Sequence, residues 1–369
     1  MPVVDAGLTS RWRGRRVLMT GHSGFIGSWL ALTLRKLGAE VHGFALNGDR
    51  QTQVRHAWLA DRGVRGAVGD VRDFDAVHHA MTAVPYDAVF HLAAQPLVRA
   101  GLDDPRETLS TNIDGSINVL EAARRCEPTV LVHVTSDKCY RNRAWPWPYR
   151  ETDDLGGGCP YSVSKAAAEV VFEGYAELFG DLCPRTASVR FGNVIGGGDF
   201  ADRRLVPDAM AALRAGQPIR LRRPTAVRPW QHVLDVVHGL LLLADHLADE
   251  VVKPGTVYNF APPGDGATAR ELAHSLAAHW SKTQEAGAPT SAAADVEESE
   301  PLFAEEELLR LDGRRAAEEL GWRHRFTLDA SAAAIVDWHR SVDNGARPDE
   351  TTTRQIDAFL DTQAEGWQW

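Results

Sequence analysis

The sequence has no long hydrophobic run, and this excludes a membrane-spanning segment. Its densest apolar patch, at residues 240–243, is far shorter than the roughly 20 residues that a transmembrane helix needs. The first 16 residues also lack the charged-then-apolar pattern of a secretory leader. We therefore expect no membrane partner and a cytoplasmic location.

The sequence also has few cysteines, and its basic residues are fewer than its acidic ones. The four cysteines (Cys126, Cys139, Cys159 and Cys183) show no close paired spacing, so neither a disulfide framework nor a metal site is expected. The 50 acidic residues outnumber the 40 lysines and arginines, which gives a net charge of −10. This balance argues against nucleic-acid binding, but it leaves room for a local basic pocket that binds a phosphorylated ligand.

The 369 residues alternate strand and helix signals in the first half of the chain. Alternation of this kind predicts parallel strands joined by right-handed crossovers. The fold class is therefore α/β, a Rossmann-type doubly wound parallel sheet with a smaller C-terminal α/β substrate domain. Strands are predicted at 16–20, 40–46, 66–69, 87–92, 129–135 and 185–191, and helices at 25–37, 73–82, 105–125 and 160–179.

The second half changes character and becomes irregular and rich in Arg and Pro. We expect residues 1–194 to form the Rossmann domain. Residues 195–369 mainly form the second domain, with some strands and helices able to return to the first. Helices are predicted at 233–247, 268–280, 313–320 and 328–338, a strand at 256–260, a flexible loop at 283–295 and a solvated acidic face at 297–307.

The glycine-rich stretch VLMTGHSGFIGSWL, at residues 17–30, organises the first half. Its glycines, Gly21, Gly24 and Gly27, lie between an apolar strand and the start of a helix. Such a turn lets a dinucleotide pyrophosphate approach the helix N-terminus. A glycine turn without a ligand would show the same triplet, but its place after the first strand of a βα series favours dinucleotide binding.

Tyr161 and Lys165, in PYSVSK, are four residues apart and share one face of a predicted helix. A neighbouring ammonium favours the phenolate form of tyrosine, so Tyr161 can act as a base. The same spacing is common on amphipathic helices that carry no chemistry. The dinucleotide turn earlier in the chain favours the functional interpretation.

Polar residues also follow the predicted strands. Ser136, Asp137 and Lys138 follow an apolar strand, where ligands bind in open α/β sheets, although a solvated polar strand end would look alike. Asp70 ends another strand and can accept a hydrogen bond from adenine or cap a helix. Asn112 lies within a predicted helix, where it either faces inward or faces solvent.

Seven segments in this order resemble the extended short-chain dehydrogenase/reductase superfamily, and within it the CDP-glucose 4,6-dehydratase family. They are GHSGFIGSWL, GDVRD, FHLAAQPLVR, TSDKCY, PYSVSK, GNVIGGGD and RPWQHV. The similarity runs from Trp12 to about Trp338. FHLAAQPLVR, TSDKCY and RPWQHV are the specific segments, whereas the glycine turn and the Tyr-Lys pair mark only the superfamily.

The resemblance implies a dehydratase mechanism that uses tightly held NAD. Tyr161, assisted by Lys165 and Ser136, would take the proton of the sugar 4-hydroxyl while hydride passes from C4 to the nicotinamide. Lys138 would then remove the C5 proton, and Asp137 would protonate the departing 6-hydroxyl. Hydride returns to C6 and gives a 4-keto-6-deoxy sugar with no net redox change.

The resemblance also implies that residues 1–194 hold the NAD-binding Rossmann domain with the catalytic residues, and that residues 195–369 mainly form the nucleotide-sugar-binding domain. It further implies the binding residues and a homodimer that pairs the helices at 105–125 and 160–179. Arginine can bind a diphosphate bidentately, although the arginines named here could equally form surface ion pairs. The implied cofactor residues are Gly21, Ser23, Gly24, Phe25, Ile26, Gly27, Asp70, Val71, Leu92, Ala93, Ala94, Gln95, Asn112, Tyr161 and Lys165. The implied substrate residues are Gln95, Ser136, Asn193, Arg204 and Arg228.

The chain departs from the family at three positions. Ile26 stands where the family commonly has Lys, and Val163 where it has Asn. Ala45 stands about where an acidic residue normally holds the ribose of NAD, so NAD rather than NADP rests on the resemblance. Two other hypotheses stay open: an epimerase or reductase of the same superfamily, and a catalytically silent NAD-binding module.

Overall fold

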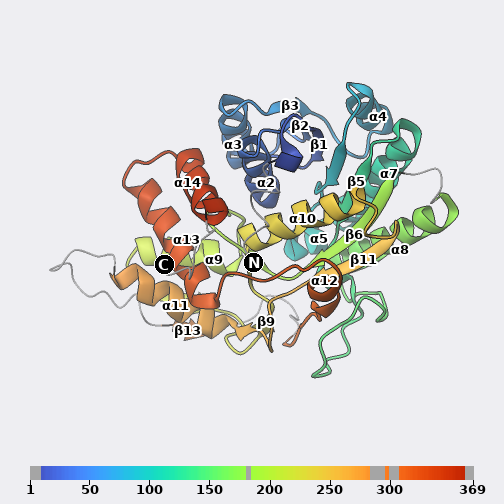
Figure 1. Cartoon of the computed structure of the whole chain (residues 1–369). Coiled ribbons are helices and arrows are strands. Elements are labelled where there is room, and N and C mark those ends of the chain that lie inside the picture. The colour runs from blue at the N-terminus through green and yellow to red at the C-terminus, as the bar shows by residue number, and fades with distance from the viewer. Residues whose placement is uncertain (1–9, 180–183, 283–295, 299–306, 362–369) are drawn as a thin grey trace.

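Seven parallel strands form one sheet in the order β11-β6-β5-β4-β1-β2-β3 (Figure 1). This order confirms the predicted doubly wound Rossmann-type fold. The strands are β1 (Arg16–Thr20), β2 (Glu40–Ala45), β3 (Arg65–Val68), β4 (Ala88–His91), β5 (Val130–Val134), β6 (Arg185–Phe191) and β11 (Thr256–Phe260). The computed structural model describes residues 10–179, 184–282, 296–298 and 307–361, so the expected loop at 283–295 and most of the acidic stretch lie outside it.

Both faces of the sheet are buried, because helices cover each of them. In β1, Val17 and Met19 face one apolar core and Leu18 faces the other, as the two-residue period of a strand requires. The first face is covered by α2 (Phe25–Lys36), α10 (Val233–Ala248) and α14 (Pro348–Asp361). The second face is covered by α4 (Phe74–Thr82), α7 (Gly115–Cys126) and α8 (Pro160–Phe179).

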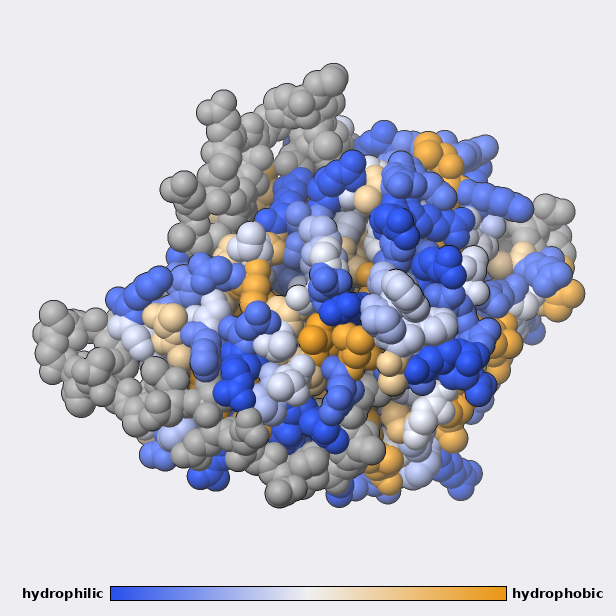
Figure 2. All heavy atoms as spheres, turned by 90° about the horizontal axis from the view of Figure 1, so that it is seen from below, coloured by the Kyte–Doolittle hydropathy of each residue, from blue (hydrophilic) through white to orange (hydrophobic). Residues whose placement is uncertain are grey.

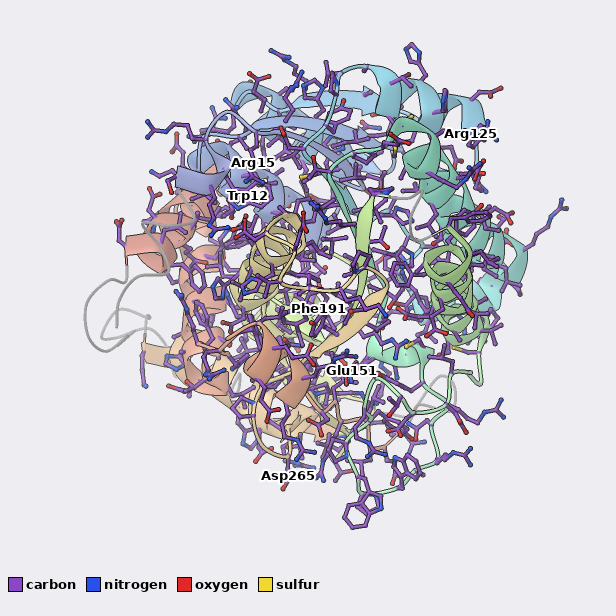
Figure 3. The ribbon with its side chains drawn as sticks, turned by 45° about the vertical axis from the view of Figure 1, so that its right-hand side comes forward. Trp12, Arg15, Arg125, Glu151, Phe191 and Asp265 are labelled. Carbon is purple, nitrogen blue, oxygen red and sulfur yellow. The ribbon has the colours of Figure 1, made fainter. Side chains whose placement is uncertain are left out.

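Part of the second half completes the sheet of the first half. β11 pairs with β6 along its length, and the rings of Phe191 and Phe260 lie 5.3 Å apart in the interior (Figure 3). The rest of the second half has its own apolar core, formed by α9 (Leu205–Arg214), α11 (Ala269–Lys282) and α13 (Leu328–Asp343). Its strand pairs are β7 (Val194–Ile195) with β10 (Gln231–His232), β8 (Ile219–Leu221) with β13 (Val296–Glu298), and β9 (Val227–Arg228) with β12 (Ala267–Thr268).

Several helices differ from the sequence prediction. The single helix expected at 105–125 is α6 (Pro105–Leu109), a π-helical turn η1 (Ser110–Asp114) and α7. The prediction missed α3 (Arg50–Asp61), α5 (Val98–Asp103), α9 and α14, whereas the helix expected at 313–320 is α12 (Arg314–Glu319). α3 escaped notice because it is mostly polar and buries only Arg55 and Leu59.

The chain segment before β1 is anchored by an aromatic contact. Trp12 is fully buried against Phe90, with ring centroids 6.1 Å apart, and the Arg15 guanidinium lies 5.7 Å from the Trp12 ring (Figure 3). Seen from below, the surface is largely hydrophilic, with small apolar patches between charged groups (Figure 2). Within the described residues, no helix has both the length and the apolar character needed to cross a bilayer.

Candidate active site

The glycine turn between β1 and α2 is too tight for side chains. Gly21 has a φ of +72°, and a Cβ there would lie 2.7 Å from the backbone nitrogen of Ala93. A Cβ on Gly27 would lie 2.2 Å from the carbonyl oxygen of Gly21. Gly24 caps α2 without a side-chain hydrogen bond, so the first-turn N–H groups stay available to an anion. Phe25 and Ile26 begin α2, so both lie where the sequence places a pyrophosphate.

The residues after β2 and β3 form the next part of the expected cofactor site. Ala45 is buried at the end of β2, so this strand end carries no carboxylate. Asp70 accepts a forked hydrogen bond from Arg72, which holds the pKa of Asp70 below its usual value. Val71 is buried against Gly115, where a Cβ would lie 2.7 Å from a Val71 methyl group.

Asn112 faces inward and ties the loop after β4 to α8. It is 2% exposed, and its Oδ1 accepts a hydrogen bond from the Gln95 N–H at 2.8 Å. Its Nδ2 donates to the Gln95 carbonyl and to Ser164 Oγ on α8. The π-helical turn η1 places this amide, as such turns often do at functional sites. Leu92, Ala93 and Ala94, which precede Gln95, are half-buried.

The Gln95 side chain is used within the same loop. Its Oε1 accepts from the Leu97 N–H at 2.6 Å, and its Nε2 donates to Thr108 Oγ1 at 2.6 Å and to the Leu97 carbonyl. These bonds shape the loop that follows β4. The structure therefore gives Gln95 a defined structural contact, and its role toward cofactor and substrate stays a prediction.

Ser136, Tyr161 and Lys165 come together at the carboxyl end of β5. Ser136 begins a short 3-10 helix, η2 (Asp137–Cys139), and its Oγ donates to Asp137 Oδ1 at 2.9 Å. Tyr161 forms a hydrogen bond with Ser136, and Lys165 Nζ lies 3.4 Å from the carbonyl of Val134. Ser136, Asp137, Tyr161 and Lys165 are all buried, whereas Lys138 is half-buried.

Burial is the main cause of the shifted pKa values of Tyr161 and Lys165. Burial raises the pKa of Tyr161 to about 12, while the hydrogen bond with Ser136 and the charge of Arg204 lower it by less. The pKa of Tyr161 is thus raised, and the expectation that the neighbouring ammonium lowers it is wrong. Burial lowers the pKa of Lys165 to about 8, and the negative charge of Glu169 opposes this change.

Three of the predicted substrate residues follow β6 in the chain: Asn193 and Arg204 lie in loops, and Arg228 ends the short strand β9. Arg204 precedes α9, and its Nη1 lies 3.3 Å from Asp199 Oδ2. Arg228 is 7% exposed, and its guanidinium donates to the carbonyl of Val227 at 2.8 Å. The carbonyl of Asn193 accepts from the Gln231 N–H. Among these residues, Arg204 has a positive charge that lowers the pKa of Tyr161.

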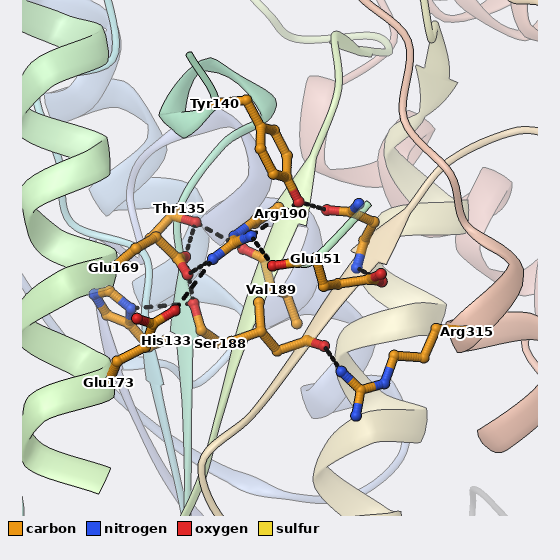
Figure 4. Close-up of polar contacts among 12 residues, drawn as sticks. His133, Thr135, Tyr140, Glu151, Glu169, Glu173, Ser188, Val189, Arg190 and Arg315 are labelled. Carbon is orange, nitrogen blue, oxygen red and sulfur yellow. Dashed lines mark hydrogen bonds and ion pairs between the residues drawn. The ribbon is translucent and has the colours of Figure 1, made fainter. Parts of the chain in front are cut away.

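A buried ion pair that the sequence did not predict joins α8 to β6 (Figure 4). Arg190 Nη2 lies 2.5 Å from Glu169 Oε2, and both side chains are fully buried. Thr135 and Ser188 donate to the other oxygen of Glu169. Glu169 is one helical turn beyond Lys165, on the helix face that carries Tyr161 and Lys165. A carboxylate on a face that packs against the sheet could have indicated a buried ion pair from the sequence.

Arg190 extends this network toward β11. Its Nη1 donates to the Tyr140 hydroxyl at 2.9 Å, and the Tyr140 hydroxyl donates to Asn259 Oδ1 at 2.7 Å (Figure 4). The Asn259 N–H donates in turn to Glu151 Oε1 at 2.8 Å. The network therefore connects α8, β5, β6 and β11. In the described part of the chain, no three His, Cys, Asp or Glu side chains are grouped to hold a metal ion.

Comparison with known proteins agrees with this geometry. The model of the NAD dependent epimerase/dehydratase family matches residues 17–261. The CDP-glucose 4,6-dehydratase of Salmonella typhimurium is 36% identical over 95% of this chain and 97% of its own length. Two solved structures share the fold. The dTDP-glucose 4,6-dehydratase from Streptomyces venezuelae with NAD bound has a TM-score of 0.73 and 24% identity, and the match covers 90% of this chain and 99% of that chain. The Thermus thermophilus UDP-glucose 4-epimerase in complex with NAD has a TM-score of 0.73 and 26% identity, and the match covers 90% of this chain and 100% of that chain.

The buried ion pair leads to a stability prediction. Glu169→Gln leaves Arg190 buried without its carboxylate, and we expect the free energy of unfolding to fall by about 3–5 kcal/mol. Glu173→Gln is the matched control, because Glu173 lies on the same helix, 3.8 Å from Arg190, but is 51% exposed. Urea unfolding should show a loss below about 1 kcal/mol for this control. Equal losses for the two variants would contradict the assignment.

The lowered pKa of Lys165 gives a pH prediction. Between pH 8 and 10.5 the folded chain holds fewer protons on Lys165 than the unfolded chain does, so stability rises with pH across this window. Lys165→Met removes this dependence. We expect wild-type stability relative to Lys165→Met to rise with pH, by up to about 1.4 kcal/mol per pH unit. Urea unfolding at pH 7, 8, 9 and 10 measures the difference, and a constant difference would refute the lowered pKa.

Proposed function

This chain belongs to the NAD dependent epimerase/dehydratase family, and we propose that it is a nucleotide-sugar 4,6-dehydratase with CDP-glucose as its substrate. One observation carries the proposal: Asp137 and Lys138 follow directly on Ser136, which bonds Tyr161. Oxidation at C4 needs Tyr161 and Lys165. Elimination of the 6-hydroxyl also requires a base for the C5 proton and a proton donor for the leaving group, and Lys138 and Asp137 would supply them.

The residues present fit a bound NAD. The turn at Gly21, Gly24 and Gly27 excludes side chains where a pyrophosphate approaches the N-terminus of α2. Val71 and Ala93 flank the same end of the sheet and would hold the rest of the dinucleotide. When bound, the oxidised nicotinamide supplies a hydride acceptor and a positive charge.

Each catalytic side chain is proposed to hold or move one proton. Ser136 holds the sugar 4-hydroxyl, and Tyr161 accepts its proton as the phenolate, whose formation the positive charges of Lys165 and of the bound nicotinamide would favour. Lys138 takes the C5 proton once the C4 ketone has made it acidic. Asp137 gives a proton to the departing 6-hydroxyl, so the sugar loses one water.

The nucleotide end of the substrate is assigned to the second half of the chain. Asn193 and Arg204 lie in loops after β6, and Arg228 lies in β9. A guanidinium fits a diphosphate by charge and by geometry. Arg204 supports this assignment best, because its charge also reaches Tyr161. A diphosphate bound at Arg204 would place the attached sugar toward the catalytic tyrosine.

An epimerase is the second candidate, since the Thermus thermophilus UDP-glucose 4-epimerase shares the fold at 26% identity. An epimerase oxidises and reduces C4 with the same tyrosine and lysine, but it expels no hydroxyl group. The pair Asp137 and Lys138 therefore separates the two reactions. A catalytically silent module is disfavoured by the complete set of Ser136, Tyr161 and Lys165.

The function is tested by incubating the purified protein with CDP-glucose, dTDP-glucose, UDP-glucose and GDP-mannose, with and without added NAD. Mass spectrometry should show loss of one water from CDP-glucose. Loss from another sugar nucleotide would correct the nucleobase. No loss from any of them, with cofactor demonstrably bound, would favour the epimerase or reductase.

A variant tests the elimination step within the same assay. Lys138→Ala should lower the rate of water loss by about 10²- to 10⁴-fold, because a proton-transfer group is removed. The control is Lys253→Ala, a change at an exposed lysine after α10. Full activity in Lys138→Ala would show that the roles given to Asp137 and Lys138 are wrong.

We also propose a homodimer formed through α8 and the helices α6 and α7. α8 exposes Val163 (43%) and Val170 (58%) two helical turns apart, and exposed apolar stripes of this kind mark interfaces. We expect a dimer in sedimentation velocity and a monomer after Val170→Glu. Val251→Glu is the control, because Val251 is 63% exposed after α10. A monomeric wild type, or a dimeric Val170→Glu, would contradict this interface.

A further inference from the structure

A buried arginine lies beside the glycine turn without an acidic partner. Arg55, on α3, is 7% exposed. Its guanidinium nitrogens lie 3.4 Å from the carbonyl oxygens of Ser23 and Gly198, longer than the ~2.9 Å of an ordinary N–H···O bond. Among the described residues, no carboxylate oxygen lies within 4.0 Å of it, and Asp199 and Asp49 act on its charge from farther away.

This arrangement contrasts with that of Arg190, a buried arginine in strand β6. Arg190 is fully buried, and Glu169 neutralises it at 2.5 Å. A buried cation without a near anion destabilises a protein, because desolvation of the charge is not offset. For Arg55, the desolvation is offset by two long carbonyl contacts, by the Phe200 ring with its centroid 5.7 Å from Cζ, and by the more distant charges of Asp199 and Asp49. An anionic ligand at this position would offset the cost further.

The surroundings of Arg55 indicate which anion this is. Ser23, whose carbonyl it contacts, directly precedes Gly24, the uncapped start of α2. Anions bind at such helix starts. The anionic group of a dinucleotide that binds at such a helix start is its diphosphate.

We propose that Arg55 binds the diphosphate of the dinucleotide cofactor, together with the N-terminus of α2. The guanidinium then exchanges two long contacts with carbonyl groups for charge-assisted bonds to phosphate oxygens. Arg55 also contacts Gly198, next to Asp199, which pairs with Arg204. The proposal rests on NAD binding in the proposed function and not on the identity of the sugar nucleotide.

The test compares wild type with Arg55→Met, Arg55→Lys and the control Arg50→Met. Arg50 is an exposed arginine at the start of the same helix. Bound NAD in each purified protein is quantified first, and calorimetric titrations with NAD, NADP, ADP-ribose and adenosine follow. We expect Arg55→Met to bind NAD and ADP-ribose about 10- to 100-fold more weakly, with adenosine unchanged, Arg55→Lys in between and Arg50→Met like wild type.

Thermal unfolding separates a ligand role from a structural one. With no nucleotide added, Arg55→Met should melt at or above the wild-type temperature, because a buried charge has been removed, and NAD should raise its melting temperature less. A lower melting temperature with unchanged NAD affinity would show that Arg55 only joins the two loops, and would overturn the proposal. Weakened binding of NADP alone, or of adenosine to the same degree as NAD, would overturn it as well. Water loss from CDP-glucose is not a readout here, so failure of this inference is distinguishable from failure of the proposed function.

Discussion

The buried pair of Glu169 and Arg190 connects the helix that carries the chemistry to the sheet that positions it. Each charge is removed from water, so each needs the other, and the hydroxyl groups of Thr135 and Ser188 complete the coordination of the carboxylate. The pair fixes the rotation of α8 relative to β6. Tyr161 and Lys165 lie on the same helix, so their approach to Ser136 depends on this contact.

The same carboxylate influences the charge of Lys165. Burial alone disfavours the ammonium of Lys165, and the negative charge of Glu169 acts against burial. The phenol of Tyr161 is affected in the opposite sense, because burial disfavours the phenolate. The site therefore favours neutral groups, and positive charge brought by ligands would favour ionisation of Tyr161.

The sequence predicted where the strands of the parallel sheet lie along the chain, and it predicted the glycine turn and the Tyr161–Lys165 pair. These features depend on local patterns. The glycine turn at Gly21 and the spacing of Tyr161 and Lys165 need no tertiary information. The ion pair of Glu169 and Arg190 joins residues 21 positions apart on different elements, so no periodic pattern shows it. The raised pKa of Tyr161 also escaped, because it depends on how deeply packing buries the phenol. α3 was missed because the charged residue Arg55 occupies a buried position in it.

The return of β11 to the edge of the sheet has a consequence for synthesis of the chain. During translation, β6 leaves the ribosome about 70 residues before its neighbour is complete, since β11 ends at Phe260. Until then the edge of β6 is open, and its unpaired backbone groups are exposed to other chains. The seven-stranded sheet therefore cannot be completed before β11 has been made. A ribosome that stalls between the two strands would release a sheet whose edge is free to aggregate.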